Sequence, residues 1–285
     1  MSFFETCIKL AAYLVCIGVA LELSHRLYWR VSSWVLSLDV HTLCRSALSS
    51  ITACIPLGTA FGVTLVFTAF LDKGSLATLG LEYDSDSLSY VACGAALAFG
   101  CVTLVFLTGV LSGFINVERS RMSEDCVSCL PMFFGGLADF FTSAVFEEII
   151  TRGYVFYVLY EAGGPASAVV GSAIIFSLAH LLKHSRTPAL FTVNAFLFGL
   201  LTAACRYYTG ALWLPIGLHF GWNVAAGPIF GLPYSGKSYD RGVVVSEVTG
   251  PEWLTGGLYS LDAGALGSVA LLVAAVGLTA VAPVL

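Results

Sequence analysis

The chain has 285 residues, of which 58% are hydrophobic and only 11% are charged, and its mean hydropathy is +0.88. Soluble domains carry about 25% charged residues, so this composition indicates a polytopic membrane protein and excludes an ordinary soluble domain. The net charge of −5 and the lack of a basic run argue against nucleic acid as a partner.

A transmembrane helix needs about 20 consecutive, mostly apolar residues, and about eight segments of the chain meet this requirement. We therefore expect an all-α fold, namely a membrane bundle of about eight transmembrane helices. In chain order the expected spans are 7–23, 51–71, 90–115, 132–160, 164–182, 188–205, 210–230 and 263–282.

The first apolar segment is followed by basic and aromatic residues instead of being preceded by basic ones. This order is the reverse of that in a cleaved signal peptide, so we expect a retained helix. Residues 24–50, which include Tyr28, Trp29 and Trp34, have the composition of an amphipathic stretch at the membrane surface.

Two longer connectors interrupt the apolar pattern, an acidic loop at 72–89 and a late loop at 231–262 that is rich in Gly, Ser and Tyr. No internal repeat stands out. We therefore expect a single membrane domain over residues 1–285.

The chemically unusual stretch of the chain is EEIITR at 147–152, which places three charges within an apolar segment. Ionisable groups at membrane depth are costly and are functional candidates by default. Glu148 and Arg152 are four residues apart with the acid first, which favours an ion pair on one helix face. Glu147 points about 100° away from Glu148 around the helix, so we expect it to be the carboxylate that carries chemistry. The alternative is that the three charges only pack helices together.

Two later apolar helices each carry a histidine that lies four residues from an aromatic or amide side chain on the same helix face. Phe176 and His180 share a face of the fifth expected span, and His219 and Asn223 share a face of the seventh. A single histidine in an apolar helix is usually an interhelical hydrogen bonder. Three such helices favour one shared polar cavity, because separate buried groups would each need a partner of their own.

Other polar and reactive residues receive structural interpretations. The nine cysteines lack a framework spacing, which is typical of buried thiols and not of disulfides or a zinc site. Asp139 and Asn194 are interpreted as packing or cavity-lining groups, and His25, His41 and His184 as loop residues.

One carboxylate, two imidazoles and an amide are suited to the hydrolysis of an acyl bond. Glu147 and His180 can together hold a water molecule and accept its proton as a general base. His219 and Asn223 can donate to the oxygen that becomes negative in the transition state. Ser177 lies three residues from His180 without an orienting acid, so a serine nucleophile is not indicated.

The ordered motifs EExxxR, FxxxH and HxxxN, all within 132–227, resemble those of the CPBP (ABI) family of intramembrane proteases. That family includes the type II CAAX prenyl endopeptidases, the Ras-converting enzymes. Phe198-Gly199 and the run 210–215 are also similar to the family, and the late segment 249–256 is similar to its bacterial members. Residues 1–131 match only in being helical.

The resemblance implies an intramembrane glutamic endopeptidase with its motif core at 132–227 and without a metal or other cofactor. Glu147 would activate water with His180, and His219 and Asn223 would form the oxyanion hole. The partners would be the lipid bilayer and a peptide or prenylated-protein substrate, although no residue identifies a prenyl groove. The late segment favours a bacterial inner membrane over an endoplasmic reticulum membrane. The supporting residues would be Glu148, Arg152 and Phe176.

Two alternatives to this hypothesis remain open. Glu147, His180 and His219 form a ligand set that catalytic zinc uses, so a zinc-dependent intramembrane metalloprotease is the rival enzyme, although the chain has no HExxH helix. The second alternative is a non-enzymatic protein, either a transporter, for which broken half-helices and internal repeats are lacking, or an immunity protein that retains the motifs.

Overall fold

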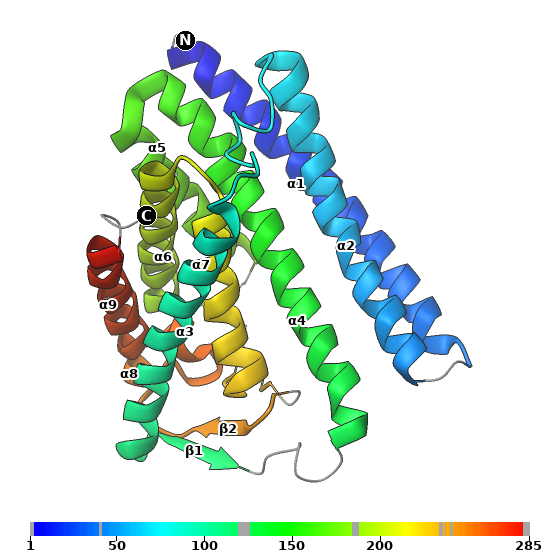
Figure 1. The fold of residues 1–285 in the computed structure, drawn as a ribbon, viewed down its shortest axis with the longest axis vertical. Helices are drawn as coiled ribbons and strands as arrows, with labels where there is room; N and C mark the ends of the chain where they lie inside the picture. Colours follow the sequence, from blue (N-terminus) through cyan, green and yellow to red (C-terminus); the bar gives the residue numbers. More distant parts are fainter. Residues whose placement is uncertain are drawn as a thin grey trace.

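The computed structural model describes residues 3–39, 42–118, 126–183, 188–233, 236, 238–239 and 242–281. Most of these residues are helical, and the long helices run side by side through the molecule (Figure 1). In this described part, six helical segments are long and apolar enough to cross a membrane. The chain is therefore a polytopic helical membrane bundle, and the expected all-α class is confirmed.

Several helices of the bundle continue directly into a π-helical segment. The N-terminal elements are α1 (Phe3–Ser37), α2 (Thr42–Val66), η1 (Phe67–Leu71), α3 (Ser87–Leu111) and β1 (Ile115–Glu118). The middle elements are α4 (Cys126–Glu148), η3 (Ile149–Val155), α5 (Phe156–Lys183), α6 (Ala189–Thr209), α7 (Trp213–Val224) and η4 (Ala225–Ile229). The late elements are β2 (Val245–Val248), α8 (Glu252–Thr255), η5 (Gly257–Asp262) and α9 (Ala265–Val281).

Three of the expected spans differ from the helices that form. The fourth and fifth expected spans are parts of one apolar segment, Phe133–Leu182, which bends sharply at Gly164. Gly164 has φ 73° and ψ −166°, a conformation that only glycine adopts readily. The seventh expected span consists of α7 followed by η4, which together fall short of the roughly 20 residues of a full span.

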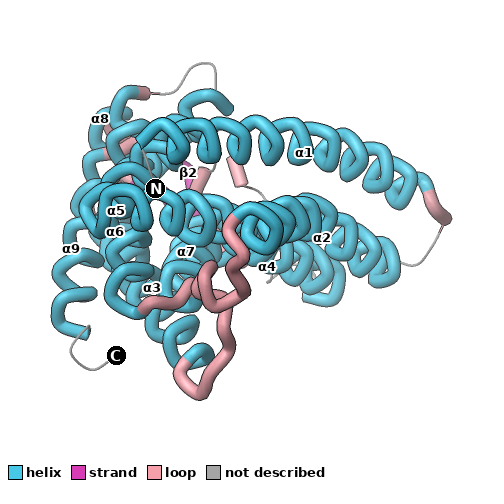
Figure 2. The backbone as a smooth tube through the Cα atoms, turned by 90° about the horizontal axis from the view of Figure 1, so that it is seen from above, coloured by secondary structure: helices cyan, strands magenta, loops and turns pink. Residues whose placement is uncertain are grey.

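The prediction of a separate surface stretch at 24–50 is wrong, because α1 continues without a break to Ser37 and α2 already begins at Thr42. The continuation of α1 packs along α2, with Val35 buried and the hydroxyls of Ser32 and Thr52 hydrogen-bonded at 3.0 Å. Interhelical hydroxyl contacts of this kind are common in membrane bundles. Helices α1 and α2 thus form an arm that extends from the rest of the bundle (Figure 2).

A two-stranded antiparallel sheet, which the sequence did not predict, joins the late loop to the end of α3. Ile115 of β1 lies opposite Val248 of β2, and Glu118 lies opposite Val245. Each strand has only four residues, too few for an alternating pattern to be recognised. The sheet fixes one end of the late loop against the bundle.

The closest helix packing that bears on the candidate site is between α3 and α7. A Cβ atom added to Gly217 would overlap the Val91 carbonyl oxygen, and one added to Gly221 would overlap the Ala95 carbonyl oxygen. Glycines four residues apart allow helix backbones to approach closely in membranes. Because His219 lies between these glycines, α3 fixes the depth and rotation of the helix turn that carries it.

Candidate active site

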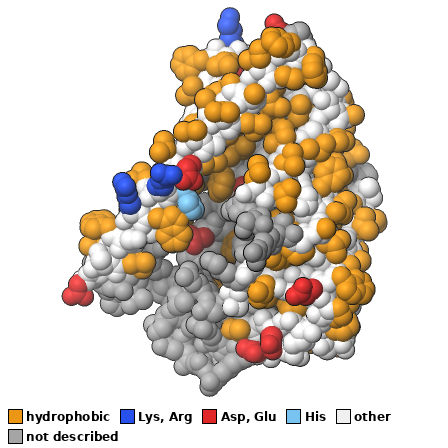
Figure 3. Space-filling model, turned by 180° about the vertical axis from the view of Figure 1, so that it is seen from behind, with side chains coloured by type: hydrophobic (Ala, Val, Ile, Leu, Met, Phe, Trp, Pro, Cys, Tyr) orange, Lys and Arg blue, Asp and Glu red, His pale blue; other side chains and the backbone are white. Residues whose placement is uncertain are grey.

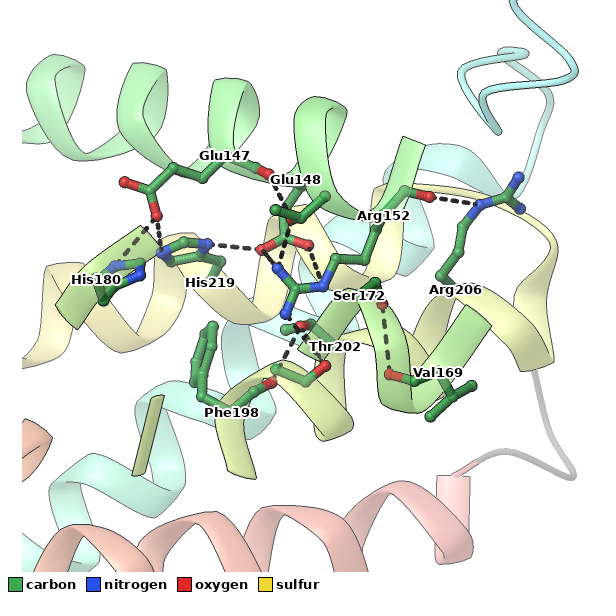
Figure 4. A network of polar contacts seen from close by, with 12 residues as sticks. Glu147, Glu148, Arg152, Val169, Ser172, His180, Phe198, Thr202, Arg206 and His219 are labelled. Atoms are coloured by element: carbon green, nitrogen blue, oxygen red, sulfur yellow. Dashed lines mark hydrogen bonds and ion pairs between the residues drawn. The ribbon is translucent and has the colours of Figure 1, made fainter. Parts of the chain in front are cut away.

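Three helices bring three of the predicted residues together (Figure 4). Glu147 lies at the end of α4, His180 near the end of α5, and His219 in α7. The Glu147 Oε2 atom is 3.6 Å from His180 Nε2 and 3.9 Å from His219 Nε2. These separations exceed a direct hydrogen bond, and they suit a carboxylate and two imidazoles that act on one small group.

Two of the three motif helices change to a π-helix directly beyond their polar residues. Helix α4 becomes η3 after Glu148, and α7 becomes η4 after Val224. Short π-helical segments are frequent at functional sites because they leave backbone groups available to new partners. In η3, the Arg152 carbonyl oxygen accepts a hydrogen bond from Arg206 Nε at 3.3 Å.

Glu148 connects two cationic or potentially cationic side chains. Its Oε2 atom is 3.4 Å from Arg152 Nε, and both of these side chains have no exposed surface. Its Oε1 atom accepts a hydrogen bond from His219 Nδ1 at 2.8 Å. The expected pair between Glu148 and Arg152 is therefore present, and Glu148 also holds His219, which the sequence did not predict.

Arg152 has further partners on both sides of this ion pair. Its Nη1 donates to the Thr151 hydroxyl at 2.6 Å, and its Nη2 donates to the Gly199 carbonyl oxygen at 3.1 Å. The guanidinium carbon lies 4.3 Å from the centre of the Phe176 ring, within cation–π range. The Phe176 ring also contacts His180, with ring centroids 4.3 Å apart. Phe176 thus connects the buried cation to the candidate base.

The hydrogen-bond partners of the two histidines imply different roles for their Nε2 atoms. His180 Nδ1 is 2.9 Å from the Phe176 carbonyl oxygen, which can only accept, so Nδ1 carries a hydrogen. In neutral His180, Nε2 is then an acceptor facing Glu147. His219 Nδ1 likewise donates to Glu148, so its Nε2 can donate only when the ring is protonated.

Asn223 supplies an unpaired donor one helical turn beyond His219. Its side chain is 4% exposed, and its Nδ2 atom has no hydrogen-bond partner among the described residues. The other two such atoms in the described part, Glu148 Oε2 and Arg152 Nε, face each other in the ion pair. An unpaired buried donor costs about 1–3 kcal/mol, so a protein retains one where a ligand or substrate atom completes the bond.

Several residues of the site were missed by the sequence reasoning. Ser143 donates to Glu147 Oε1 at 3.3 Å, and its position four residues before Glu147 was an available signal. Phe198 was noted only as similar to the family, and its contact with the His219 ring, with centroids 5.0 Å apart, was not predicted. Asp262 lies close enough to interact electrostatically with the charged groups of the site. Its acidic side chain within the apolar segment Gly257–Ala280 was also a signal.

Two observations bear on the metal alternative. Among the described residues, no group of three or more His, Cys, Asp or Glu side chains is arranged to hold a metal ion. The Nδ1 atoms of both histidines are engaged by protein oxygens, a contact that zinc-bound histidines also make through their second ring nitrogen, so these bonds are compatible with either mechanism.

Interpretations made outside the motifs had mixed outcomes. His25 lies in α1 and accepts a hydrogen bond from Trp29, so its assignment to a loop is wrong, whereas His41 and His184 lie outside the described residues. Cys101 and Cys205 are buried thiols as expected. The expectation of buried thiols is wrong for four cysteines on outward helix faces, namely Cys7, Cys16, Cys54 and Cys93.

A comparison with protein-family models matches residues 130–225 to the family described as type II CAAX prenyl endopeptidase Rce1-like. Residues 130–225 are related to this family. The matched segment contains the three motifs and lies close to the expected motif core at 132–227. It leaves α1, α2, α3 and the late elements outside the match. Comparisons with curated proteins and with solved structures gave no match.

Proposed function

We propose that the protein is an intramembrane endopeptidase of the CAAX-protease type, which hydrolyses a peptide bond with water as the nucleophile. The relation of residues 130–225 to type II CAAX prenyl endopeptidases supports the class of reaction. The observation that carries the proposal is the unpaired, buried Nδ2 atom of Asn223, located one turn from His219 at a site that also contains Glu147.

Glu147 and His180 activate the water in this proposal. Ser143 holds Glu147 Oε1, while Glu147 Oε2 faces His180 Nε2 at 3.6 Å. Water bound to both groups transfers a proton to Glu147 as its oxygen attacks the carbonyl carbon of the substrate. Protonated Glu147 then gives this proton to the leaving amine. General-base catalysis of this kind contributes about 10²- to 10⁴-fold to the rate.

His219 and Asn223 stabilise the negative charge that develops on the carbonyl oxygen. The 2.8 Å hydrogen bond to Glu148 orients the His219 ring and places a buried carboxylate beside it. Protonated His219 donates through Nε2, and Asn223 donates through Nδ2. Two donors positioned in a water-poor site stabilise the transition state more than the ground-state carbonyl.

The remaining motif residues support this arrangement. Arg152 keeps Glu148 in position through the buried ion pair, and Phe176 packs between Arg152 and His180. We also propose that the described helices act as one membrane domain, because α3 lies outside the family match yet packs on the turn that carries His219.

The proposed substrate is a membrane-associated protein, and the family relation favours a prenylated CAAX-type protein. The late segment at 249–256 favours a bacterial inner membrane as the location. No metal or other cofactor is part of the proposed reaction.

The experiment that tests the proposal compares the purified wild type with Glu147→Gln on candidate membrane peptides, each with and without a prenyl group. Mass spectrometry identifies the products. We expect cleavage by the wild type and none by Glu147→Gln. Equal cleavage of the prenylated and unprenylated forms would remove the CAAX assignment but leave the endopeptidase. Equal product from both enzymes, or none from either, would contradict the proposed function.

A further inference from the structure

The late loop contributes a tightly folded segment, residues 256–264, to the interior of the bundle. Ser260 has φ 48°, which is an uncommon backbone conformation for a residue other than glycine. The Ser260 carbonyl oxygen packs so closely on Gly256 that a Cβ atom there would overlap it. Strained backbone of this kind persists only where the surrounding structure holds it, and it is concentrated at functional sites.

Asn194 of α6 holds this segment on both sides of Asp262. The Asn194 Nδ2 atom donates to the Leu261 carbonyl oxygen at 3.3 Å and to the Gly264 carbonyl oxygen at 3.0 Å. The Ser268 hydroxyl donates to Asn194 Oδ1 at 2.6 Å. Asn194 is 2% exposed, so these are buried hydrogen bonds. The position of Asp262 is therefore fixed from α6 and α9.

Asp262 in turn contacts the helix that carries His219 and Asn223. Its Oδ1 atom accepts a hydrogen bond from Trp222 Nε1 at 3.3 Å. Trp222 is buried directly before Asn223 in α7, and its ring packs on Phe198, which also packs on His219. A chain of contacts thus runs from the late loop to both proposed oxyanion donors.

Asp262 also lies near the residues that the proposed reaction uses. It is within electrostatic range of Glu147, His180 and His219.

We propose that Asp262 is a positioning residue of the active site, which acts through Trp222 to hold the 219–223 turn so that His219 and Asn223 face the same substrate oxygen. This inference rests on the proposed function. It extends the site to a late-loop residue outside the segment 130–225 that matches the family.

The test is a double-mutant cycle on the full-length protein with a cleaved membrane peptide as substrate. Asp262→Ala and Trp222→Phe each remove the hydrogen bond, and each should lower kcat by about tenfold with little change in KM. The double variant should be no slower than either single variant, because both remove the same contact. Asp262→Asn keeps an acceptor oxygen and should recover most of the lost kcat.

Glu247→Ala is the matched control, because Glu247 is an exposed carboxylate of the same late loop, and it should leave kcat unchanged. Thermal unfolding of every variant separates a positioning defect from loss of fold. The inference would be overturned if the double variant lost kcat by the product of the two single losses. Full activity of Asp262→Ala would also overturn it. Glu147→Gln in the same assay tests the proposed function separately. If Glu147→Gln is inactive and Asp262→Ala is fully active, the proposed function holds and only the role of Asp262 is wrong.

Discussion

Two Glu-x-x-x-Arg pairs with identical spacing lie in very different surroundings in this molecule. In the α1 arm, Arg26 Nε is 2.8 Å from Glu22 Oε1, and the two side chains are 69% and 61% exposed. At the candidate site, Arg152 Nε is 3.4 Å from Glu148 Oε2, and neither side chain has exposed surface. The shorter pair is therefore the exposed one, and the longer pair is fully buried.

The difference shows that neither the spacing nor the separation of a charge pair measures its importance. Exposed pairs contribute about 0–1 kcal/mol because solvent screens them. The buried pair is part of a network that includes His219, the Gly199 carbonyl oxygen and the Phe176 ring. Removal of one member leaves the other charges without compensation in a poorly polar interior.

The outer surface of the molecule is apolar around the exposed pair, whereas the interior around the buried pair contains polar groups. Seen from behind, the molecule is largely hydrophobic, with a few charged side chains on its surface (Figure 3). Large apolar residues such as Leu23, Leu27 and Trp29 lie exposed next to Glu22 and Arg26 on α1. Such a surface faces a lipid environment, whereas the polar residues of the motifs face one another.

The largest expected effect is on stability, from Arg152→Ala compared with Arg26→Ala. Loss of Arg152 leaves Glu148 buried without its ion-pair partner, which should lower the free energy of unfolding by about 3–5 kcal/mol. Loss of Arg26 should cost at most about 1 kcal/mol. Chemical unfolding of both purified variants in the same detergent measures the difference. Equal losses would show that burial does not distinguish the two pairs.

The next effect concerns catalysis by the unpaired donor. Asn223→Ala should lower kcat about 10²- to 10³-fold through loss of an oxyanion donor, while the unfolding temperature stays close to that of the wild type. Asn116→Ala, in exposed strand β1, is the matched control and should leave kcat unchanged. A fully active Asn223→Ala would remove this residue from the mechanism.

A smaller effect is expected from a methyl group added at the contact of α3 with α7. Gly221→Ala would force Ala95 of α3 away from α7 and should destabilise the protein by about 1–3 kcal/mol. Gly62 in the arm has no atom within 4 Å of an added Cβ, so Gly62→Ala should be neutral or slightly stabilising. Thermal unfolding of the two variants compares them, and a neutral Gly221→Ala would show that this contact does not fix α7.

The smallest expected effect is that of metal chelators. Activity should survive EDTA and phenanthroline, because the proposed reaction uses Glu147 as the base and two side-chain donors in place of a Lewis acid. Metal analysis of the purified protein accompanies the assay. Stoichiometric zinc, with activity lost on its removal and restored on its return, would replace the glutamic mechanism with the zinc alternative.

The sequence was sufficient for the fold class and for three of the residues that meet at the candidate site. Long apolar segments determine a helical membrane bundle, and polar groups in three such segments favour a shared site. Glu147, His180 and His219 do lie together in the structure. Helical spacing also predicted the contact of Glu148 with Arg152.

Contacts that depend on how helices are rotated and packed could not be read from spacing. The bond from His219 to Glu148 requires the register of α7 against α4, which Gly217 and Gly221 set through α3. The contact of the late loop with Trp222 depends on Asn194, which binds the backbone on both sides of Asp262. The sequence indicated only a packing or cavity-lining role for Asn194. Such long-range contacts arise from tertiary packing and leave no periodic signal in the sequence.

The most direct test of the central claim compares two adjacent carboxylates, Glu147 and Glu148, in one set of measurements of kcat and unfolding temperature. Glu147→Gln should lose about 10²- to 10⁴-fold in kcat and keep the unfolding temperature of the wild type. Glu148→Gln should lower the unfolding temperature, because Arg152 and His219 lose their shared carboxylate. A Glu147→Gln variant that keeps wild-type kcat would contradict the assignment of Glu147 as the catalytic base.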